Sequence, residues 1–121
     1  MKKLSLAVLL ISVSTIVSAA SIKDVVGSYK ITHTDLPILN IVTVDINGNV
    51  KLTEQSPYGT LECKGKGTIK NDILSSKVTC TNGSDFTQKI NLKNVKNFAK
   101  FKAPVYSSLY EQEVEMNFER L

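Results

Sequence analysis

The chain has 121 residues, a formal net charge of +4, one histidine and no tryptophan. This length is enough for one domain. Two of the positive charges, Lys2 and Lys3, lie in the first segment, and without them the net charge falls from +4 to +2. A charge this small argues against nucleic acid or an anionic membrane surface as the partner.

The first 19 residues have the pattern of a bacterial secretory signal peptide. Two lysines precede an apolar run over 4–17, and Val17-Ser18-Ala19 offers small or apolar residues to a signal peptidase. The run is shorter than the roughly 20 residues of a spanning helix, which disfavours an uncleaved anchor. We expect a signal peptide over 1–19, or one residue more, and a single domain over 20–121. That domain is expected in the periplasm or outside the cell, with no membrane span.

The two cysteines, Cys63 and Cys80, are expected to form a structural disulfide, because an even number in an exported chain indicates a bridge. Between them, Asn71-Asp72 tolerates the positive φ angles of a two-residue type I′ turn. Such a turn places Ile69 opposite Leu74 and the two cysteines opposite each other, with Cα atoms about 4.5 Å apart. A redox pair or a metal site is the alternative, but the sequence has no C-x-x-C spacing and no histidine nearby.

Apolar and polar residues alternate with a period of two throughout the rest of the chain, which predicts β-strands. Eight strands are expected, over 26–32, 39–46, 50–54, 60–70, 73–80, 85–93, 98–102 and 108–121. Pro104 is expected to interrupt the chain before the last strand. Gly65 and Gly67, in the middle of one strand, are expected to mark a bulge, a bend or a close approach.

Strand register follows from keeping the apolar residues on one face. A three-residue loop at Asn47-Gly48-Asn49 places Ile46 opposite Val50 and Val44 opposite Leu52. The last strand alternates most clearly of all. One of its faces is expected to hold Tyr110, Val114, Met116 and Phe118, and the other Glu111, Glu113, Glu115 and Glu119.

Consecutive strands joined by tight turns, each with one apolar face, predict an all-β fold of sequential antiparallel hairpins. We expect a single small up-and-down barrel of eight strands, in which the first and last strands pair. A two-layer β-sandwich is the alternative. A membrane-spanning barrel is disfavoured because its outer face must be apolar, whereas the polar face here carries lysines and glutamates.

A short motif adds to this expectation. Gly27-Ser28-Tyr29 resembles the Gly-x-Trp of the calycin superfamily, which includes the lipocalins, with tyrosine in place of tryptophan. Arg120 is similar in position to the late arginine that packs across that aromatic ring. The resemblance implies a lipocalin-like barrel in which Arg120 lies over Tyr29 at the closed end, in a cation–π contact. It implies no particular ligand.

The sequence shows no catalytic constellation. His33 lies near Asp35, which could orient its ring, but no nucleophile elbow accompanies it. One histidine and two bridged cysteines do not assemble a metal site. We therefore expect a protein that is not an enzyme and carries no metal or cofactor.

The leading hypothesis is an exported binding protein that takes a small apolar ligand in the barrel or at its mouth. The candidate ligand-binding residues are Tyr29, Val42, Val44, Leu52, Phe86, Ile90, Val114, Met116 and Phe118. Small eight-stranded barrels are often filled by their own side chains, so the sequence leaves open whether this interior has room.

The alternative hypothesis is a module that binds a periplasmic or extracellular protein, such as an inhibitor of a cell-wall hydrolase. It would act through loops, because exposed loop aromatics often mark binding sites. The candidate residues of these loops are Leu36, Pro37, Ile38, Pro57, Tyr58 and Tyr106.

Overall fold

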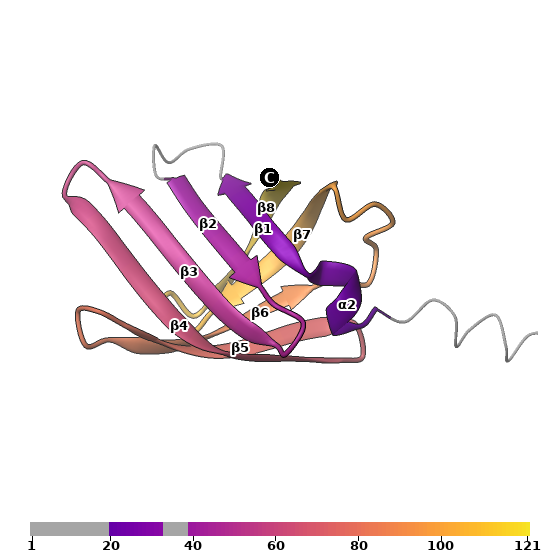
Figure 1. Cartoon of the computed structure of the whole chain (residues 1–121), viewed down its shortest axis with the longest axis horizontal. Coiled ribbons are helices and arrows are strands. Elements are labelled where there is room, and N and C mark those ends of the chain that lie inside the picture. The colour runs from indigo at the N-terminus through magenta and orange to yellow at the C-terminus, as the bar shows by residue number, and fades with distance from the viewer. Residues whose placement is uncertain (1–19, 33–38) are drawn as a thin grey trace, which may run out of the picture.

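The computed structural model describes residues 20–32 and 39–121 and shows a closed barrel of eight antiparallel strands (Figure 1). The elements are α2 (Ile22–Val25), β1 (Gly27–Thr32), β2 (Leu39–Val44), β3 (Asn49–Ser56), β4 (Gly59–Lys70), β5 (Ile73–Cys80), β6 (Asp85–Asn91), β7 (Lys100–Ser107) and β8 (Gln112–Arg120). Each strand pairs with the next, and β8 pairs with β1. The prediction of an up-and-down barrel is confirmed, and the sandwich alternative is wrong.

Alternation along each strand separates an inner face from an outer face. In β5, Leu74 and Val78 are buried, while Lys77 and Thr79 are exposed. The same alternation holds in β6, where Ile90 is buried and Lys89 is exposed. Burial of the apolar face of every strand favours closure of the sheet. Closure also leaves no strand edge unpaired. No helix in the described part of the chain is long and apolar enough to cross a membrane.

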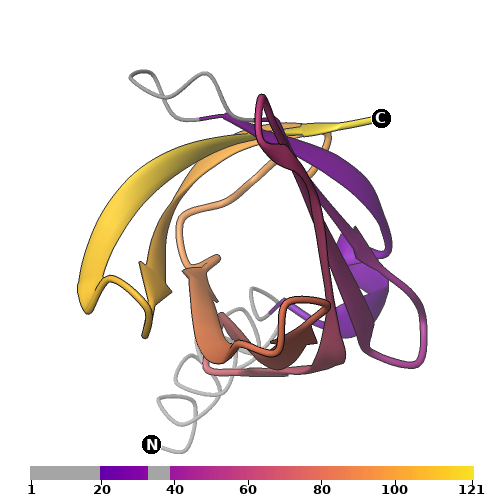
Figure 2. The same cartoon turned by 90° about the vertical axis from the view of Figure 1, so that its left-hand side faces the viewer.

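The barrel has two different ends. The connections 45–48, 71–72 and 92–99 lie at the end that carries α2, which we call the floor (Figure 1). The connections 57–58 and 108–111 lie at the opposite end, the mouth, which faces the viewer in Figure 2. Backbone hydrogen bonds tie the floor connections together, such as Gly67 N–H to the Gly48 carbonyl at 2.7 Å and Leu92 N–H to the Asp72 carbonyl at 2.8 Å.

The hairpin of β4 and β5 has the predicted register. Asn71 and Asp72 have φ angles of 52° and 64°, as a type I′ turn requires. Ile69 lies opposite Leu74, and Cys63 lies opposite Cys80. These two cysteines form a disulfide with their Cα atoms 3.9 Å apart. The disulfide prediction is therefore confirmed.

The predicted register of β2 and β3 is wrong by two residues. Val44 lies opposite Val50 and Val42 opposite Leu52. The Asp45 carboxylate causes the shift, because it accepts hydrogen bonds from the N–H groups of Asn47 and Asn49, both at 2.9 Å, and so holds a longer turn. A shift of two residues preserves the alternation, so the valines still face inward.

The prediction that Pro104 interrupts the chain is wrong. This proline lies inside β7, opposite Glu115 of β8. The ladder between β6 and β7 covers three pairs and ends at Ile90 and Val105. Because β6 offers Pro104 no ladder partner, the missing proline N–H costs no hydrogen bond there.

The two glycines of β4 mark close approaches, as predicted. A Cβ atom at Gly65 would collide with the backbone carbonyl of Lys77 on β5. A Cβ atom at Gly67 would lie 2.9 Å from Val50 Cγ2. Glycine therefore lets neighbouring strands curve tightly into a small barrel at these positions.

Candidate functional site

The inner face of the barrel holds all nine of the predicted ligand-binding residues, but they fall into two groups. Five are buried, namely Tyr29, Val42, Val44, Ile90 and Phe118. Four are only partly buried, namely Leu52, Phe86, Val114 and Met116. The first group belongs to the packed core, so it is not available to a ligand without rearrangement.

Aromatic rings fill the floor half of the barrel. The Phe101 ring stacks on the Phe118 ring with centroids 4.7 Å apart. Its edge-to-face neighbours are Tyr29, at 6.0 Å, and Phe98, at 5.7 Å. Such packing stabilises the fold beyond the area it buries. The floor is therefore a solid base rather than a binding cavity.

Arg120 covers this base from the floor end. Its guanidinium carbon lies 5.2 Å from the centre of the Tyr29 ring. Its Nη2 donates to the Tyr29 hydroxyl and to the Asp24 carbonyl, the latter at 3.1 Å. The Tyr29 hydroxyl in turn donates to the Val25 carbonyl at 3.0 Å. The expected contact between Arg120 and Tyr29 is thus present.

The mouth half of the barrel is different, because several of its inward-facing apolar side chains are only partly buried. These residues are Leu52 of β3, Leu61 of β4, Phe86 of β6, and Val114 and Met116 of β8. Ile69 and Phe101 toward the floor are also partly buried, but most of the partly buried apolar side chains on the inner face lie in the mouth half. The mouth half therefore holds most of the accessible apolar surface of the inner face.

The disulfide forms part of the wall of this half. Cys63 lies opposite Leu52 on one side and Cys80 on the other. Both cysteines are buried and face inward. The bridge thus fastens β4 to β5 beside the accessible apolar residues and holds the wall rigid there.

Polar side chains also face inward. Asn40 and Glu54 lie opposite each other toward the mouth, and both are partly buried. Ser76 and Gln88 lie opposite each other deeper in the barrel, and both are buried. The sequence analysis did not include these four residues among the site candidates, although the alternation that selected their apolar neighbours also assigns them to the inner face.

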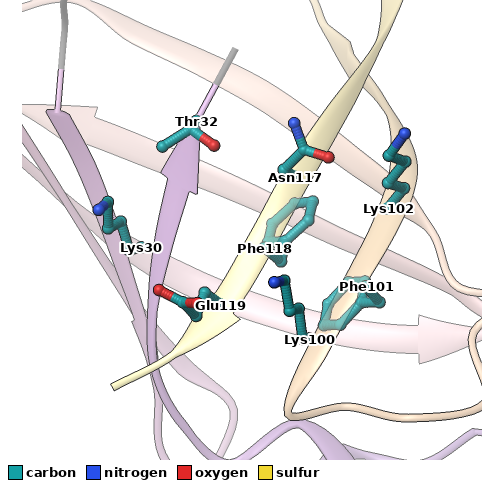
Figure 3. Close-up of a pocket in the computed structure, with 8 residues that line it drawn as sticks. All are labelled: Lys30, Thr32, Lys100, Phe101, Lys102, Asn117, Phe118 and Glu119. Atoms are coloured by element: carbon teal, nitrogen blue, oxygen red, sulfur yellow. The ribbon is translucent and has the colours of Figure 1, made fainter. Parts of the chain in front are cut away.

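The outer face carries a groove of about 470 Å³ over β8. Figure 3 shows Asn117 and Glu119 of β8 between Lys30 of β1 and Lys100 and Lys102 of β7. None of these three lysines is in an ion pair within the described residues, where the pairs join Glu62 to two other lysines. These three lysines outnumber the single carboxylate of Glu119 in the groove, but exposed lysines in water bind anions weakly.

A second outer groove, of about 350 Å³, contains Tyr106 together with Lys89 and Glu113. Tyr106 was predicted to lie in a binding loop, and this is wrong. It belongs to β7 and points outward in the middle of the barrel wall, opposite Glu113. The error comes from treating Pro104 as the end of a strand.

The mouth carries exposed apolar side chains. Tyr58, next to the exposed Pro57, is 99% exposed in the turn between β3 and β4. Leu109 and Tyr110 are also exposed, in the turn between β7 and β8. Tyr110 was expected on the inner face of the last strand, and this is wrong, because the strand begins two residues later. The other loop candidates, Leu36, Pro37 and Ile38, lie outside the described residues, as does His33.

No sequence signal marks the turn at 108–111, because it contains no glycine, proline or asparagine. Its tight geometry rests on Glu111, whose φ is 52°, and on hydrogen bonds from the Tyr110 and Glu111 N–H groups to the Ser107 carbonyl. Glutamate rarely adopts this conformation, so the turn is not predictable from residue preference.

Two carboxylates have shifted pKa values, and both are structural. Hydrogen bonds from Asn49 and Asn47 hold the pKa of Asp45 below its usual value. A hydrogen bond from Lys51, aided by the charges of Lys51 and Lys64, lowers the pKa of Glu62. Both groups lie outside the barrel interior. Residues 20–32 and 39–121 contain no group of three or more His, Cys, Asp or Glu placed to hold a metal ion.

Comparison with known protein families, with curated proteins and with solved structures finds no match to this chain. Its function must therefore be inferred from the barrel and the side chains that line it.

Proposed function

We propose that this chain is an exported, non-enzymatic binding protein of lipocalin-like architecture that holds a small, largely apolar molecule in the mouth half of its barrel. The single observation that carries the proposal is the set of partly exposed apolar side chains on the inner face, contributed by β3, β4, β6 and β8. Sites for small molecules are typically concave and mostly apolar in this way.

Three further features support the proposal. The disulfide suits an oxidising compartment, which agrees with the signal-peptide pattern. The packed aromatic floor closes one end of the barrel, so a ligand enters and leaves at the mouth. The contact of Arg120 with Tyr29 agrees with the resemblance to the calycin superfamily.

A test uses N-phenyl-1-naphthylamine, a neutral dye that fluoresces in apolar surroundings. We expect the processed protein to bind it, the inward substitution Met116→Trp to abolish binding by filling the mouth half, and the outward substitution Asn117→Trp to leave binding unchanged. These neighbours in β8 point to opposite sides of the wall. Failure of the unmodified protein to bind, or equal binding by both variants, contradicts the proposal.

The second candidate function is capture of a protein partner, such as a cell-wall hydrolase, by the mouth-end turns. It is favoured by the almost complete exposure of Tyr58, together with Leu109 and Tyr110. Aromatic side chains of this kind often carry binding energy at interfaces. Under this function the unmodified protein slows the hydrolysis of peptidoglycan by enzymes of a periplasmic extract. Tyr58→Ala should abolish this inhibition and leave dye binding intact. Unchanged inhibition by the variant excludes this function.

A further inference from the structure

A row of polar side chains crosses the inner wall of the barrel. Ser76 of β5 lies opposite Gln88 of β6, and Gln88 lies opposite Ser107 of β7. Ser76 is 5% exposed and Gln88 is 8% exposed. From this row we infer that the ligand is a neutral amphipathic molecule, whose polar group is an alcohol or amide held by Gln88 and Ser76. The inference rests on the proposed function and deepens it.

Apolar residues surround the row on both sides. Toward the floor lie Leu74 and Ile90, opposite each other and both buried. Toward the mouth lie Val78, which is buried, and Phe86, which is partly buried. A polar group at this depth has Gln88 and its two serine neighbours beside it on this wall, and Gln112 of β8 lies next to Ser107. The rest of the ligand meets the apolar side chains on the two sides of the row.

The Gln88 amide has hydrogen-bonding capacity to spare. Within the described residues, neither its side chain nor that of Ser76 hydrogen-bonds to another protein group. In the same part of the chain, every fully buried side-chain nitrogen and oxygen does have a partner. The polar atoms of Gln88 and Ser76 lie on the inner face of the barrel, where water or a ligand can satisfy them.

The charge of the interior argues for a neutral ligand. Glu54 and Arg120 are the charged residues at inward-facing positions of the described strands. Arg120 is engaged at the floor by the Tyr29 hydroxyl and the Asp24 carbonyl. A carboxylate placed beside Gln88 would have no cation to pair with, and Glu54 toward the mouth would repel it.

The test compares 1-decanol with decanoate as competitors that displace N-phenyl-1-naphthylamine at pH 8, where decanoate is ionised. The two have the same carbon chain and differ at the polar group. We expect decanol to displace the dye at a concentration at least about tenfold lower than decanoate does, because only decanol forms its hydrogen bond without burying an unpaired charge.

The substitution Gln88→Leu removes the amide and keeps a similar volume, so it is expected to fold. It should weaken displacement by decanol about tenfold, and Ser76→Ala should weaken it less. Lys89→Leu, on the outer face of the same strand, is the matched control and should change nothing.

The outcomes separate the inference from the function on which it rests. Two results overturn the polar subsite: displacement of the dye by decanol and decanoate at equal concentrations, or displacement by decanol from Gln88→Leu that is as strong as from the unmodified protein. In either case, binding of the dye itself still supports an apolar site. Absence of dye binding to the unmodified protein overturns the proposed function, and the subsite with it.

Discussion

At the scale of single residues, Arg120 and Tyr29 join the last strand of the barrel to the first. They lie opposite each other where β8 pairs with β1. The arginine lies over the ring and also donates to the Tyr29 hydroxyl. Gly27 leaves room for the contact, since a Cβ atom there would lie 3.3 Å from Arg120 Nε, and its φ of +142° suits glycine.

We predict that Arg120→Met lowers the free energy of unfolding by about 1–3 kcal/mol, because it removes a cation–π contact and two hydrogen bonds while keeping an unbranched side chain. Urea denaturation measures the change. In a double-mutant cycle with Tyr29→Phe, the two changes should be less than additive because they share an interaction.

The control is Lys102→Met, an exposed residue on the outer face of β7, which should change stability by about 0.5 kcal/mol or less. Full additivity of Arg120→Met and Tyr29→Phe would show that the two residues are not coupled, and that their contact does not stabilise the fold.

At the scale of elements, the hairpin of β4 and β5 is the part of the barrel most strongly held. It combines eight paired positions, a tight turn and the disulfide between Cys63 and Cys80. The seam between β6 and β7, the strands that follow this hairpin, has only three paired positions. Local opening is therefore expected at the β6–β7 seam before the β4–β5 hairpin.

We predict that the double substitution Cys63→Ala with Cys80→Ala lowers the free energy of unfolding by about 3 kcal/mol, since the bridge closes a loop of 17 residues in the unfolded chain. Guanidinium denaturation of this variant and of the oxidised protein measures the difference. The reduced protein serves as the control and should lose a similar amount. A variant as stable as the oxidised protein would mean that the bridge does not constrain the unfolded chain.

The elements show where residue patterns suffice and where they do not. Asn71-Asp72 predicts both its own turn and the pairing of two strands, because a two-residue loop leaves one register. Asp45 does not reveal that its carboxylate will hold a longer turn, so the register of β2 and β3 was predicted two residues away. Pro104 was predicted to end a strand. A strand accepts proline where the neighbouring strand forms no ladder hydrogen bond with it, and the local sequence does not show where the ladder with β6 ends.

At the scale of the whole molecule, the barrel divides into a packed floor and an accessible mouth. Phe118 shows the first condition, being buried and stacked on Phe101. Phe86 shows the second, being partly buried on the inner face of β6. The same residue type at two depths therefore has different surroundings, close packing at the floor and partial accessibility at the mouth.

We predict that Phe118→Ala lowers the free energy of unfolding by about 3–5 kcal/mol, because it empties a fully packed site. Phe86→Ala should cost about 2 kcal/mol or less, because part of its ring is already accessible, and it should weaken binding of N-phenyl-1-naphthylamine. Urea denaturation and dye titration of both variants test this. Equal destabilisation by the two changes would mean that the mouth is as tightly packed as the floor.

The residues by themselves determined that this chain forms eight strands, which side chains face inward over most of their length, and that the two cysteines pair. These properties depend on a two-residue period and on short turns, which are local. Only the tertiary structure decided which inward residues are packed and which are accessible, that Tyr106 and Tyr110 lie outside the core, and that Gln88 lies opposite Ser76 on the adjacent strand. Depth along a barrel axis depends on the stagger of all eight strands together, and no stretch of sequence contains that information.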